Sequence, residues 1–284
     1  MKGKRILITG ATSGIGKIAA LRLAEKGAEI LLHGRNPHKT EKVRDELIRQ
    51  SGNEAIVSVL ADLSLKEDIL KLAEEVNNRY DRLDVLINNA GGVMNKSRAT
   101  NPEGWEKTMA LNVLAPYMLS ALLYERLQAA PEARIINTAS AAHRMAKVNP
   151  DDWMYHKKYN GLQAYGDAKL CVILLGKEFA RRRPEGNIVM NAMHPGVVAT
   201  NFAGESNTFY NVFFKLFRPF LLSPEKGADT LIYLASDPEG AKHNGDYFVK
   251  RKPARIHFRG DMEKLQKQVW QLCEEYSGIG FPGL

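Results

Sequence analysis

The sequence predicts an α/β protein built on one doubly wound parallel sheet of about seven strands, with helices on both faces, in a single domain. Two patterns predict it. Short apolar runs rich in β-branched residues recur along the chain at intervals long enough to hold a helix. Those intervals carry apolar residues with the 3.6-residue period of an amphipathic helix. Strands that alternate with helices form a parallel sheet with helices on both faces, and right-handed crossovers fix the hand of the fold.

The expected strands follow one another along most of the chain. The first, at residues 5–9, ends directly before a glycine-rich segment, and the last, at 247–249, precedes a helical tail at 261–276. Each is a short apolar run, as buried strands are. The seven strands are residues 5–9, 30–33, 56–60, 85–88, 134–138, 188–193 and 247–249.

The first two intervals show the helical pattern most clearly. Residues 15–26 carry Ile18, Leu21 and Leu23 at helical spacing, and residues 39–50 end at Ser51-Gly52-Asn53, which is typical of a helix stop. The chain has no internal repeat, low-complexity tract or linker. Residues 1–284 are therefore predicted to form one domain.

The amino-acid composition excludes several classes of protein. The 284 residues are 44% apolar and 25% charged, which excludes a disordered chain. Cys171 and Cys273 stand 102 positions apart without a C-x-x-C pair, which argues against a disulfide framework and a zinc module. The seven histidines show neither H-x-x-x-H nor H-E-x-x-H, so we expect no catalytic metal. A net charge of +8 suits nucleic acid, a membrane surface or an anionic cofactor without choosing among them.

Membrane and secretion signals are not expected. Residues 1–5 lead at once into a short strand, whereas a secretory signal needs a longer apolar region. A membrane span needs about 18 apolar residues, and the nearest candidate, 210–222, is short and interrupted by Lys215 and Arg218. We expect a cytoplasmic protein.

The glycine-rich segment after the first strand predicts a dinucleotide site and hence a Rossmann-type fold. Its spacing is G-x-x-x-G-x-G, and it opens the first helix. Glycines permit a tight turn and let the backbone approach a pyrophosphate at the positive helix N-terminus. The alternative is a glycine-rich turn without a ligand. The residues concerned are Gly10, Thr12, Ser13, Gly14, Ile15 and Gly16.

The end of the second strand indicates which dinucleotide is bound. An acidic residue there hydrogen-bonds the ribose hydroxyls of NAD and repels a 2′-phosphate. This chain has no carboxylate at that point and instead carries Arg35 followed by Asn36. A guanidinium suits bidentate phosphate contact, so NADP(H) is favoured over NAD(H). The alternative is a solvated surface arginine.

Tyr165 and Lys169 suggest acid–base chemistry. The two are four positions apart, so on a helix their side chains share one face. A free tyrosine has a pKa of about 10, and a neighbouring ammonium favours the phenolate and lowers that pKa. An alkoxide formed from a carbonyl needs such a proton donor, and the reverse reaction needs the base.

With these motifs the chain resembles the short-chain dehydrogenase/reductase family over nearly its whole length. The glycine-rich turn matches the family's TGxxxGxG, and Tyr165 with Lys169 matches its YxxxK pair. The other matches are Asp62 and Leu63 after the third strand; Asn89, Ala90 and Gly91 in the NNAG signature; Asn112; Ser140 after the fifth strand; and Pro195, Gly196, Val198 and Thr200 in the PGxVxT segment.

The resemblance implies a role for each catalytic residue. Tyr165 would be the acid–base group, Ser140 would orient the substrate oxygen, and Lys169 would also hold the nicotinamide ribose. Asn112 would anchor a water that relays protons. The remaining matched residues, with Arg35 and Asn36, would bind NADP(H).

Within the family the chain is similar to the retinol-dehydrogenase-like group that acts on lipophilic alcohols. Arg35, Ala142-His143 and the segment 223–228 are similar to segments of that group, as is the interval of 25 positions from Ser140 to Tyr165. Ala168 departs from a serine that is frequent before the lysine, and Gly166 and Asp167 are also less usual. His143 is interpreted either as a pocket residue or as a structural histidine.

Two segments are expected to surround the substrate. Residues 201–223 are rich in large aromatic and aliphatic side chains and are interpreted as a lid over a lipophilic pocket. Packing against the core and an interfacial membrane contact through Lys215 and Arg218 are the alternatives. The insert at residues 145–163, with Trp153, Tyr155 and Tyr159, is expected to form the opposite wall.

The leading hypothesis is an NADP(H)-dependent oxidoreductase that acts on a lipophilic alcohol, aldehyde or ketone of retinoid or sterol type. A broad carbonyl or quinone reductase and a non-catalytic NADP(H)-binding sensor are the alternatives. The family resemblance implies a homo-oligomer, a dimer or tetramer. Nucleic acid is not an expected partner, because the basic cluster at 250–252 has no helix-turn-helix or finger pattern beside it.

Overall fold

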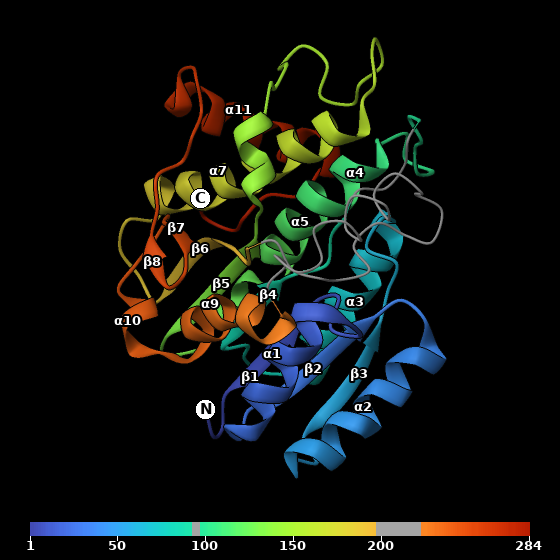
Figure 1. The fold of residues 1–284 in the computed structure, drawn as a ribbon, viewed down its shortest axis with the longest axis vertical. Helices are drawn as coiled ribbons and strands as arrows, with labels where there is room; N and C mark the ends of the chain where they lie inside the picture. The colour runs from blue at the N-terminus through green and yellow to red at the C-terminus, as the bar shows by residue number, and fades with distance from the viewer. Residues whose placement is uncertain (93–96, 197–222) are drawn as a thin grey trace.

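A computed structural model describes residues 1–92, 97–196 and 223–284. An eight-stranded sheet crosses the molecule in the order β3-β2-β1-β4-β5-β6-β7-β8 (Figure 1). Every neighbouring pair is parallel except β7 and β8. The strands are β1 (Arg5–Ile8), β2 (Glu29–Gly34), β3 (Ile56–Leu60), β4 (Val85–Asn88), β5 (Ala133–Thr138), β6 (Ile188–His194), β7 (Tyr247–Val249) and β8 (Lys252–Pro253).

Helices connect the parallel strands, as the alternating pattern predicts. A π-helical turn, Ala110–Leu114, joins α4 to α5, and a 3₁₀ turn, Ala141–Met145, follows β5. The helices are α1 (Gly14–Glu25), α2 (Pro37–Ser51), α3 (Lys66–Arg79), α4 (Lys107–Met109), α5 (Ala115–Leu122), α6 (Tyr124–Gln128), α7 (Gly161–Arg182), α9 (Pro224–Ser236), α10 (Pro238–Ala241) and α11 (Met262–Ser277).

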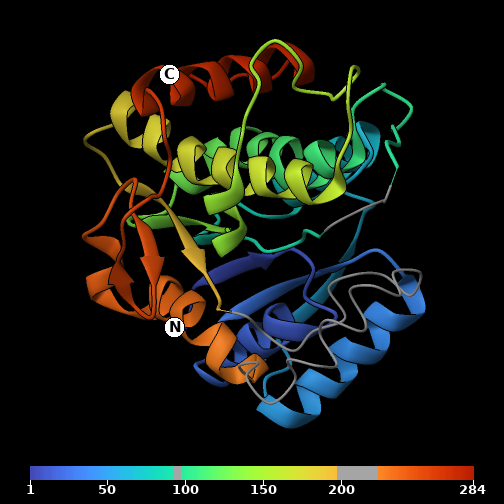
Figure 2. The ribbon, with the colours of Figure 1, turned by 45° about the horizontal axis from the view of Figure 1, so that its top comes forward.

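The helices form layers on both faces of the sheet. Helices α1, α2 and α9 cover one face, and α3, α5 and α7 cover the other, where α11 lies outside α7 as a further layer (Figure 2). The doubly wound single-domain fold predicted from the sequence is confirmed. Because both faces are covered, the central strands β1, β4 and β5 are buried and read as nearly continuous apolar runs.

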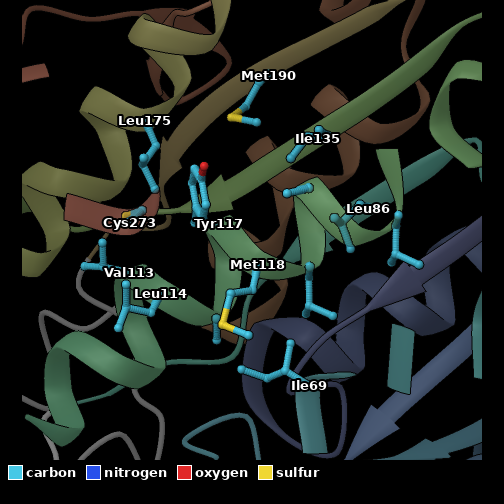
Figure 3. Packing of buried hydrophobic residues seen from close by; sticks show 14 of the residues in the cluster. Ile69, Leu86, Val113, Leu114, Tyr117, Met118, Ile135, Leu175, Met190 and Cys273 are labelled. Atoms are coloured by element: carbon cyan, nitrogen blue, oxygen red, sulfur yellow. The ribbon is translucent and has the colours of Figure 1, made fainter. Parts of the chain in front are cut away.

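The larger apolar cluster fills the space between the sheet, α5 and α7. Tyr117 and Met118 of α5 pack there with Leu175 of α7, Met190 of β6 and Cys273 of α11 (Figure 3). Both cysteines of the chain are free and buried, so they serve this core as small apolar groups. Helix α11 thus belongs to the same core as the sheet.

The expected count of about seven strands misses one strand. β8 is a two-residue antiparallel strand that turns back on β7 through Lys250 and Arg251, whose φ angles are 52° and 62°. Arg251 makes an ion pair with Asp229, which holds the turn against α9. A strand made of Lys252 and Pro253 has no apolar run, and therefore no sequence pattern signals it.

The strand order reverses between β1 and β4, which lie side by side and parallel. From β1 the chain proceeds to β2 and β3 on one side, and β4 returns to the other side of β1. Ligands of doubly wound proteins bind at such a switch point. Among the described residues, no helix combines the length and the apolar character needed to cross a bilayer.

Candidate active site

The glycine-rich turn needs its glycines because it packs against the segment that follows β4. Gly10 has a φ of 64°, and a Cβ on it would lie 2.9 Å from the Cα of Ala90. A Cβ on Gly16 would lie 2.5 Å from Nδ2 of Asn89 and 2.6 Å from the Gly10 carbonyl oxygen. Gly14 adopts a φ of 56°. Any side chain at Gly10 or Gly16 would push the two segments apart.

Hydrogen bonds join these two segments. The Thr9 hydroxyl accepts from the amides of Asn89 and Ala90, each at 2.9 Å. The Asn89 side chain donates to the carbonyl oxygens of Thr9 and Gly10 at 3.0 and 3.2 Å. Two of the motifs predicted to bind the cofactor therefore form one unit at the switch point.

His33 is a site residue that the sequence pattern did not reveal. Its Nδ1 accepts from the Gly10 amide at 3.1 Å, and its Nε2 lies 3.1 Å from the Ala61 carbonyl oxygen and donates to it. Burial lowers the pKa of His33 to about 4, so the ring is neutral at pH 7. His33 thereby ties the ends of β1, β2 and β3 together. Its only sequence signal was a polar residue inside an apolar strand.

The start of α1 is suited to an anion. Ser13 is the N-cap residue but makes no capping hydrogen bond, and no acidic residue stands in the first turn. Amides at a helix start point outward and carry partial positive charge. Thr12 lies beside the end of β2, since a Cβ on Gly34 would come within 2.5 Å of its Cγ2, and Ile15 is half-buried. These residues fit the pyrophosphate of a dinucleotide.

Arg35 and Asp62 meet at the ends of β2 and β3. Nη1 of Arg35 lies 3.5 Å from Oδ2 of Asp62, with the two side chains 70% and 29% exposed. Burial alone would raise the pKa of Asp62, but hydrogen bonds from Ser64 and the charge of Arg35 lower it below its usual value. Leu63 is buried, and its side chain packs in the larger apolar cluster. Asn36 caps α2 by accepting from the Lys39 amide at 2.9 Å.

Asn112 lies in the π-helical turn before α5 and is held on three sides. Its Nδ2 donates to the carbonyl oxygens of Gly92 and Thr108 at 2.9 and 2.8 Å, and its Oδ1 accepts from the Gly92 amide at 3.0 Å. Short π-helical turns are frequent at functional sites. Both amide hydrogens are used, whereas among the described residues the Gly92 amide is the donor that reaches Oδ1, and an amide oxygen can accept from a second donor such as water.

Gly91 connects Asn112 to Lys169. A Cβ on Gly91 would lie 2.6 Å from Oδ1 of Asn112 and 3.1 Å from Nζ of Lys169. Any side chain at this position would fill the space between the amide and the ammonium. Two residues predicted to be catalytic are thereby brought together across a glycine.

Tyr165 and Lys169 share one face of α7, as their spacing predicts. Both are buried, and Nζ of Lys169 lies 5.6 Å from the centre of the Tyr165 ring. The ammonium also donates to the Thr138 carbonyl oxygen at the end of β5, at 2.8 Å. Burial lowers the pKa of Lys169 to about 7, so it exchanges a proton easily near neutral pH.

Ser140 begins the 3₁₀ turn that packs against α7. Its hydroxyl accepts from the Ala142 amide at 3.2 Å, and its carbonyl oxygen lies 2.7 Å from Nδ1 of His143. His143 is buried, and its Nε2 accepts from the His257 amide at 3.4 Å, which makes it a structural histidine. Across the turn, Nδ1 of His194 accepts from the Ala141 amide at 3.2 Å.

The PGxVxT segment, the last motif predicted to bind the cofactor, is described only in part. Pro195 and Gly196 follow β6, and Gly196 has a φ of 83°. Val198, Thr200 and residues 201–222 of the expected lid lie outside the described residues.

Comparison with known proteins gives two kinds of relatives. The family model for short chain dehydrogenases matches residues 4–211. A Streptomyces protein described as a candidate daunorubicin C-13 ketoreductase is 39% identical over 272 residues, which cover 95% of this chain and 91% of that protein. Human retinol dehydrogenase 13 is 32% identical over 288 residues, which cover 99% of this chain and 87% of that protein.

Solved structures agree with the fold. A crystal structure of an uncharacterised protein of Mycobacterium paratuberculosis covers 99% of this chain and 96% of its own, with a TM-score of 0.76 and 24% identity. A candidate short chain dehydrogenase of Shigella flexneri 2a, solved in complex with NADP, covers 88% and 98% with a TM-score of 0.67 and 24% identity. The motifs, the joined glycine-rich and NNAG segments, and the matched relatives lead to one conclusion: the chain belongs to the short-chain dehydrogenase/reductase family, in its retinol-dehydrogenase-like group.

Proposed function

We propose that this oxidoreductase uses NADP(H) and acts on a lipophilic alcohol, aldehyde or ketone. Membership of the family establishes the broader class, an oxidoreductase of alcohol and carbonyl groups. The observation that carries the proposal is the pairing of Tyr165 with Lys169 at the end of β5, where the ammonium also meets the Thr138 carbonyl oxygen. A tyrosine in this position has a cation at hand to favour its phenolate.

We assign a separate role in the proposed reaction to each of Ser140, Tyr165 and Lys169. When bound, the nicotinamide supplies or accepts the hydride. Ser140 orients the substrate oxygen by a hydrogen bond. The Tyr165 hydroxyl donates a proton to that oxygen in reduction, and the Tyr165 phenolate removes the proton in oxidation. Lys169 stabilises the tyrosinate and, next to Gly91 and Asn112, can exchange its own proton with water. Each residue thus holds or moves a proton at one atom.

Arg35 supports NADP(H) as the cofactor. It stands at the end of β2, its side chain is 70% exposed, and its bond to Asp62 at 3.5 Å is long. A guanidinium held so loosely can turn toward a 2′-phosphate. A carboxylate at the end of β2, which would favour NAD(H), is absent from the sequence.

Two exposed apolar side chains support a lipophilic substrate. Met145 ends the turn that Ser140 begins, and Leu162 precedes Tyr165 by three positions on α7; they are 50% and 42% exposed. Residues three apart on a helix share a side, so Leu162 lies on the same side as the catalytic tyrosine. We infer that these two exposed side chains contact the apolar part of a substrate. The names of the relatives, a retinol dehydrogenase and a ketoreductase, agree with such substrates.

The experiment that tests the proposal is a screen for NADPH oxidation with aldehydes and ketones graded by chain length and ring size. We expect turnover to rise with apolar surface, and Tyr165→Phe to abolish it while NADPH still binds. Preference for small quinones indicates a broad carbonyl reductase instead. NADPH binding with no turnover across the panel contradicts an enzymatic role and favours a sensor.

The cytoplasmic setting and the homo-oligomer also stay proposals. We expect the purified protein to be a dimer or tetramer, which light scattering measures directly. A peripheral membrane contact, which is an alternative interpretation of residues 201–223, is tested by co-sedimentation with lipid vesicles.

A further inference from the structure

Asp167 is a buried carboxylate on the catalytic helix whose role the proposed reaction does not explain. It stands on α7 two positions after Tyr165 and is 3% exposed. Its Oδ1 accepts from the Lys147 amide and from Nε2 of Gln163, each at 2.7 Å, and its Oδ2 accepts from the Tyr155 hydroxyl at 2.7 Å. None of these described donors is a lysine or arginine side chain. Hydrogen bonds alone compensate its burial.

Two of these donors come from the chain that follows the catalytic serine. Lys147 lies two positions after the 3₁₀ turn, and Tyr155 lies in the middle of the 145–163 insert. The carboxylate therefore binds the insert to the helix that carries Tyr165. The pKa of Asp167 is raised by burial, and the hydrogen bonds from Tyr155, Lys147 and Gln163 oppose that rise.

Neighbouring positions of α7 contact the same turn. A Cβ on Gly166 would lie 3.0 Å from the Ala142 carbonyl oxygen, so the absence of a side chain lets the turn approach the helix backbone. Nε2 of Gln163 also donates to the Met145 carbonyl oxygen at 3.2 Å. Gly166 and Asp167 are two of the three positions, with Ala168, at which this chain departs from the residues usual in the family. Both serve the same contact.

We propose that Asp167 is a positioning residue, which holds the 3₁₀ turn of Ser140 against α7 and so sets Ser140 relative to Tyr165. This inference rests on the proposed function, because it assigns a consequence for turnover to the contact. The serine is joined to its turn by hydrogen bonds to Ala142 and His143, so the turn moves as a unit. Loosening its far end changes where the serine hydroxyl meets the substrate oxygen.

The insert has other attachments that should preserve its fold when Asp167 is changed. The Tyr159 hydroxyl donates to Oε1 of the buried Glu106 at 3.1 Å. Nε of Arg98 donates to the Met154 carbonyl oxygen at 2.7 Å. Loss of the Asp167 contact should therefore loosen the turn without unfolding the protein.

The test is Asp167→Asn, with Asp152→Asn as the matched control. Asn places an amide NH₂ where the Asp167 carboxylate accepts from three donors. Asp152 instead contacts groups of the insert itself: the amides of His156 and Lys157, and Nδ1 of His156 at 3.3 Å. The readouts are kcat and KM with a carbonyl substrate from the screen, the Kd for NADPH, and amide hydrogen exchange over residues 141–147. Tyr155→Phe, which removes one donor and no carboxylate, is a milder second variant.

In Asp167→Asn we expect kcat to fall about tenfold, the Kd for NADPH to stay within about twofold, and exchange over 141–147 to quicken, because small displacements of positioning groups are costly. Tyr155→Phe should lower kcat about threefold, and Asp152→Asn should leave kcat and exchange unchanged. The inference is overturned if Asp167→Asn and Tyr155→Phe both keep the wild-type kcat. It is also overturned if Asp152→Asn lowers kcat as much as Asp167→Asn does.

Failure of the proposed function gives a different result. If the wild-type protein turns over no carbonyl substrate, the proposed function is refuted. Amide hydrogen exchange then tests only whether Asp167 attaches the turn to α7. Faster exchange over 141–147 in Asp167→Asn than in Asp152→Asn supports the attachment, and equal exchange overturns it.

Discussion

The ring of His33 accepts a hydrogen bond from the amide of Gly10 across 3.1 Å and thereby fixes the turn at the switch point. Nδ1 can accept this hydrogen bond only when the imidazole ring is neutral. Burial lowers the pKa of His33 to about 4, so the ring is neutral at pH 7. The turn that is expected to hold the pyrophosphate therefore depends on an uncharged histidine from the neighbouring strand.

This relationship predicts acid sensitivity. The unfolded chain binds a proton on His33 below pH 6.5, whereas the folded chain does so only below about pH 4. The free energy of unfolding should therefore fall as pH drops from 6.5 to 4, by an amount on the order of 3 kcal/mol from this group. Urea unfolding at several pH values measures it. His33→Gln should flatten the slope, the exposed His38→Gln should not, and equal slopes in all three proteins contradict the prediction.

Arg35→Ala should weaken NADPH binding far more than NADH binding. A charge-assisted hydrogen bond contributes about 1.5–3 kcal/mol, which corresponds to a loss in NADPH affinity of about tenfold or more. NADH lacks the 2′-phosphate and should change by less than about twofold. Fluorescence titration of both cofactors measures the effect, with the exposed Arg49→Ala on α2 as control. Equal weakening of the two cofactors would refute the phosphate contact.

Lys169 predicts a pH dependence of cofactor affinity. Its pKa of about 7 in the free protein should rise when an anionic dinucleotide binds, because the anion favours the charged ammonium. Binding then takes up a proton above pH 7, so the Kd for NADPH should increase about tenfold between pH 7 and 9. Lys169→Met should bind more weakly with a flat profile, and Lys177→Met on the same helix should keep the slope. A flat wild-type profile contradicts the shift.

Met145 and Leu162 should determine the preference for apolar substrates. Replacing both by serine removes apolar contact area, and each buried methylene contributes about 0.8 kcal/mol. We expect kcat/KM for a long-chain aldehyde to fall about tenfold, with little change for a short one. Leu70→Ser on α3, which also removes an exposed leucine, is the control. Unchanged chain-length preference in the double variant shows that neither side chain contacts substrate.

Phe281 should contribute strongly to stability. It is buried beyond α11 and lies with its ring centre 4.9 to 5.7 Å from those of Tyr117, Tyr124, Phe179 and Trp270. Phe281→Ala leaves a cavity at the junction of α5, α7 and α11, and such changes cost about 3–5 kcal/mol. Chemical unfolding measures the loss, with the less buried Phe258→Ala as the milder control. A loss equal to that of Phe258→Ala argues against the cluster as a major stabiliser.

Local patterns in the sequence predicted most of the fold and indicated the residues that we propose to be catalytic. The strands, the first two connecting helices and the G-x-x-x-G-x-G turn each depend on neighbours in sequence, so their residues identify them. Tyr165 and Lys169 are four apart on one helix, and their shared face follows from the helical repeat. β8 was not predicted, because Lys252 and Pro253 form a strand only through pairing with β7.

The contacts that complete the site join distant parts of the chain. His33 meets Gly10 across 23 positions, Asn112 meets Gly92 across 20, and Asp167 meets Tyr155 across 12. No sequence pattern predicts these contacts, because each of them arises from the strand order and the packing of helices. The low pKa values of His33 and Lys169 have the same origin, since burial sets them and burial is a property of the folded chain. The sequence by itself determined which chemical groups the protein carries, and the tertiary structure decided which of them are dry, neutral and in contact.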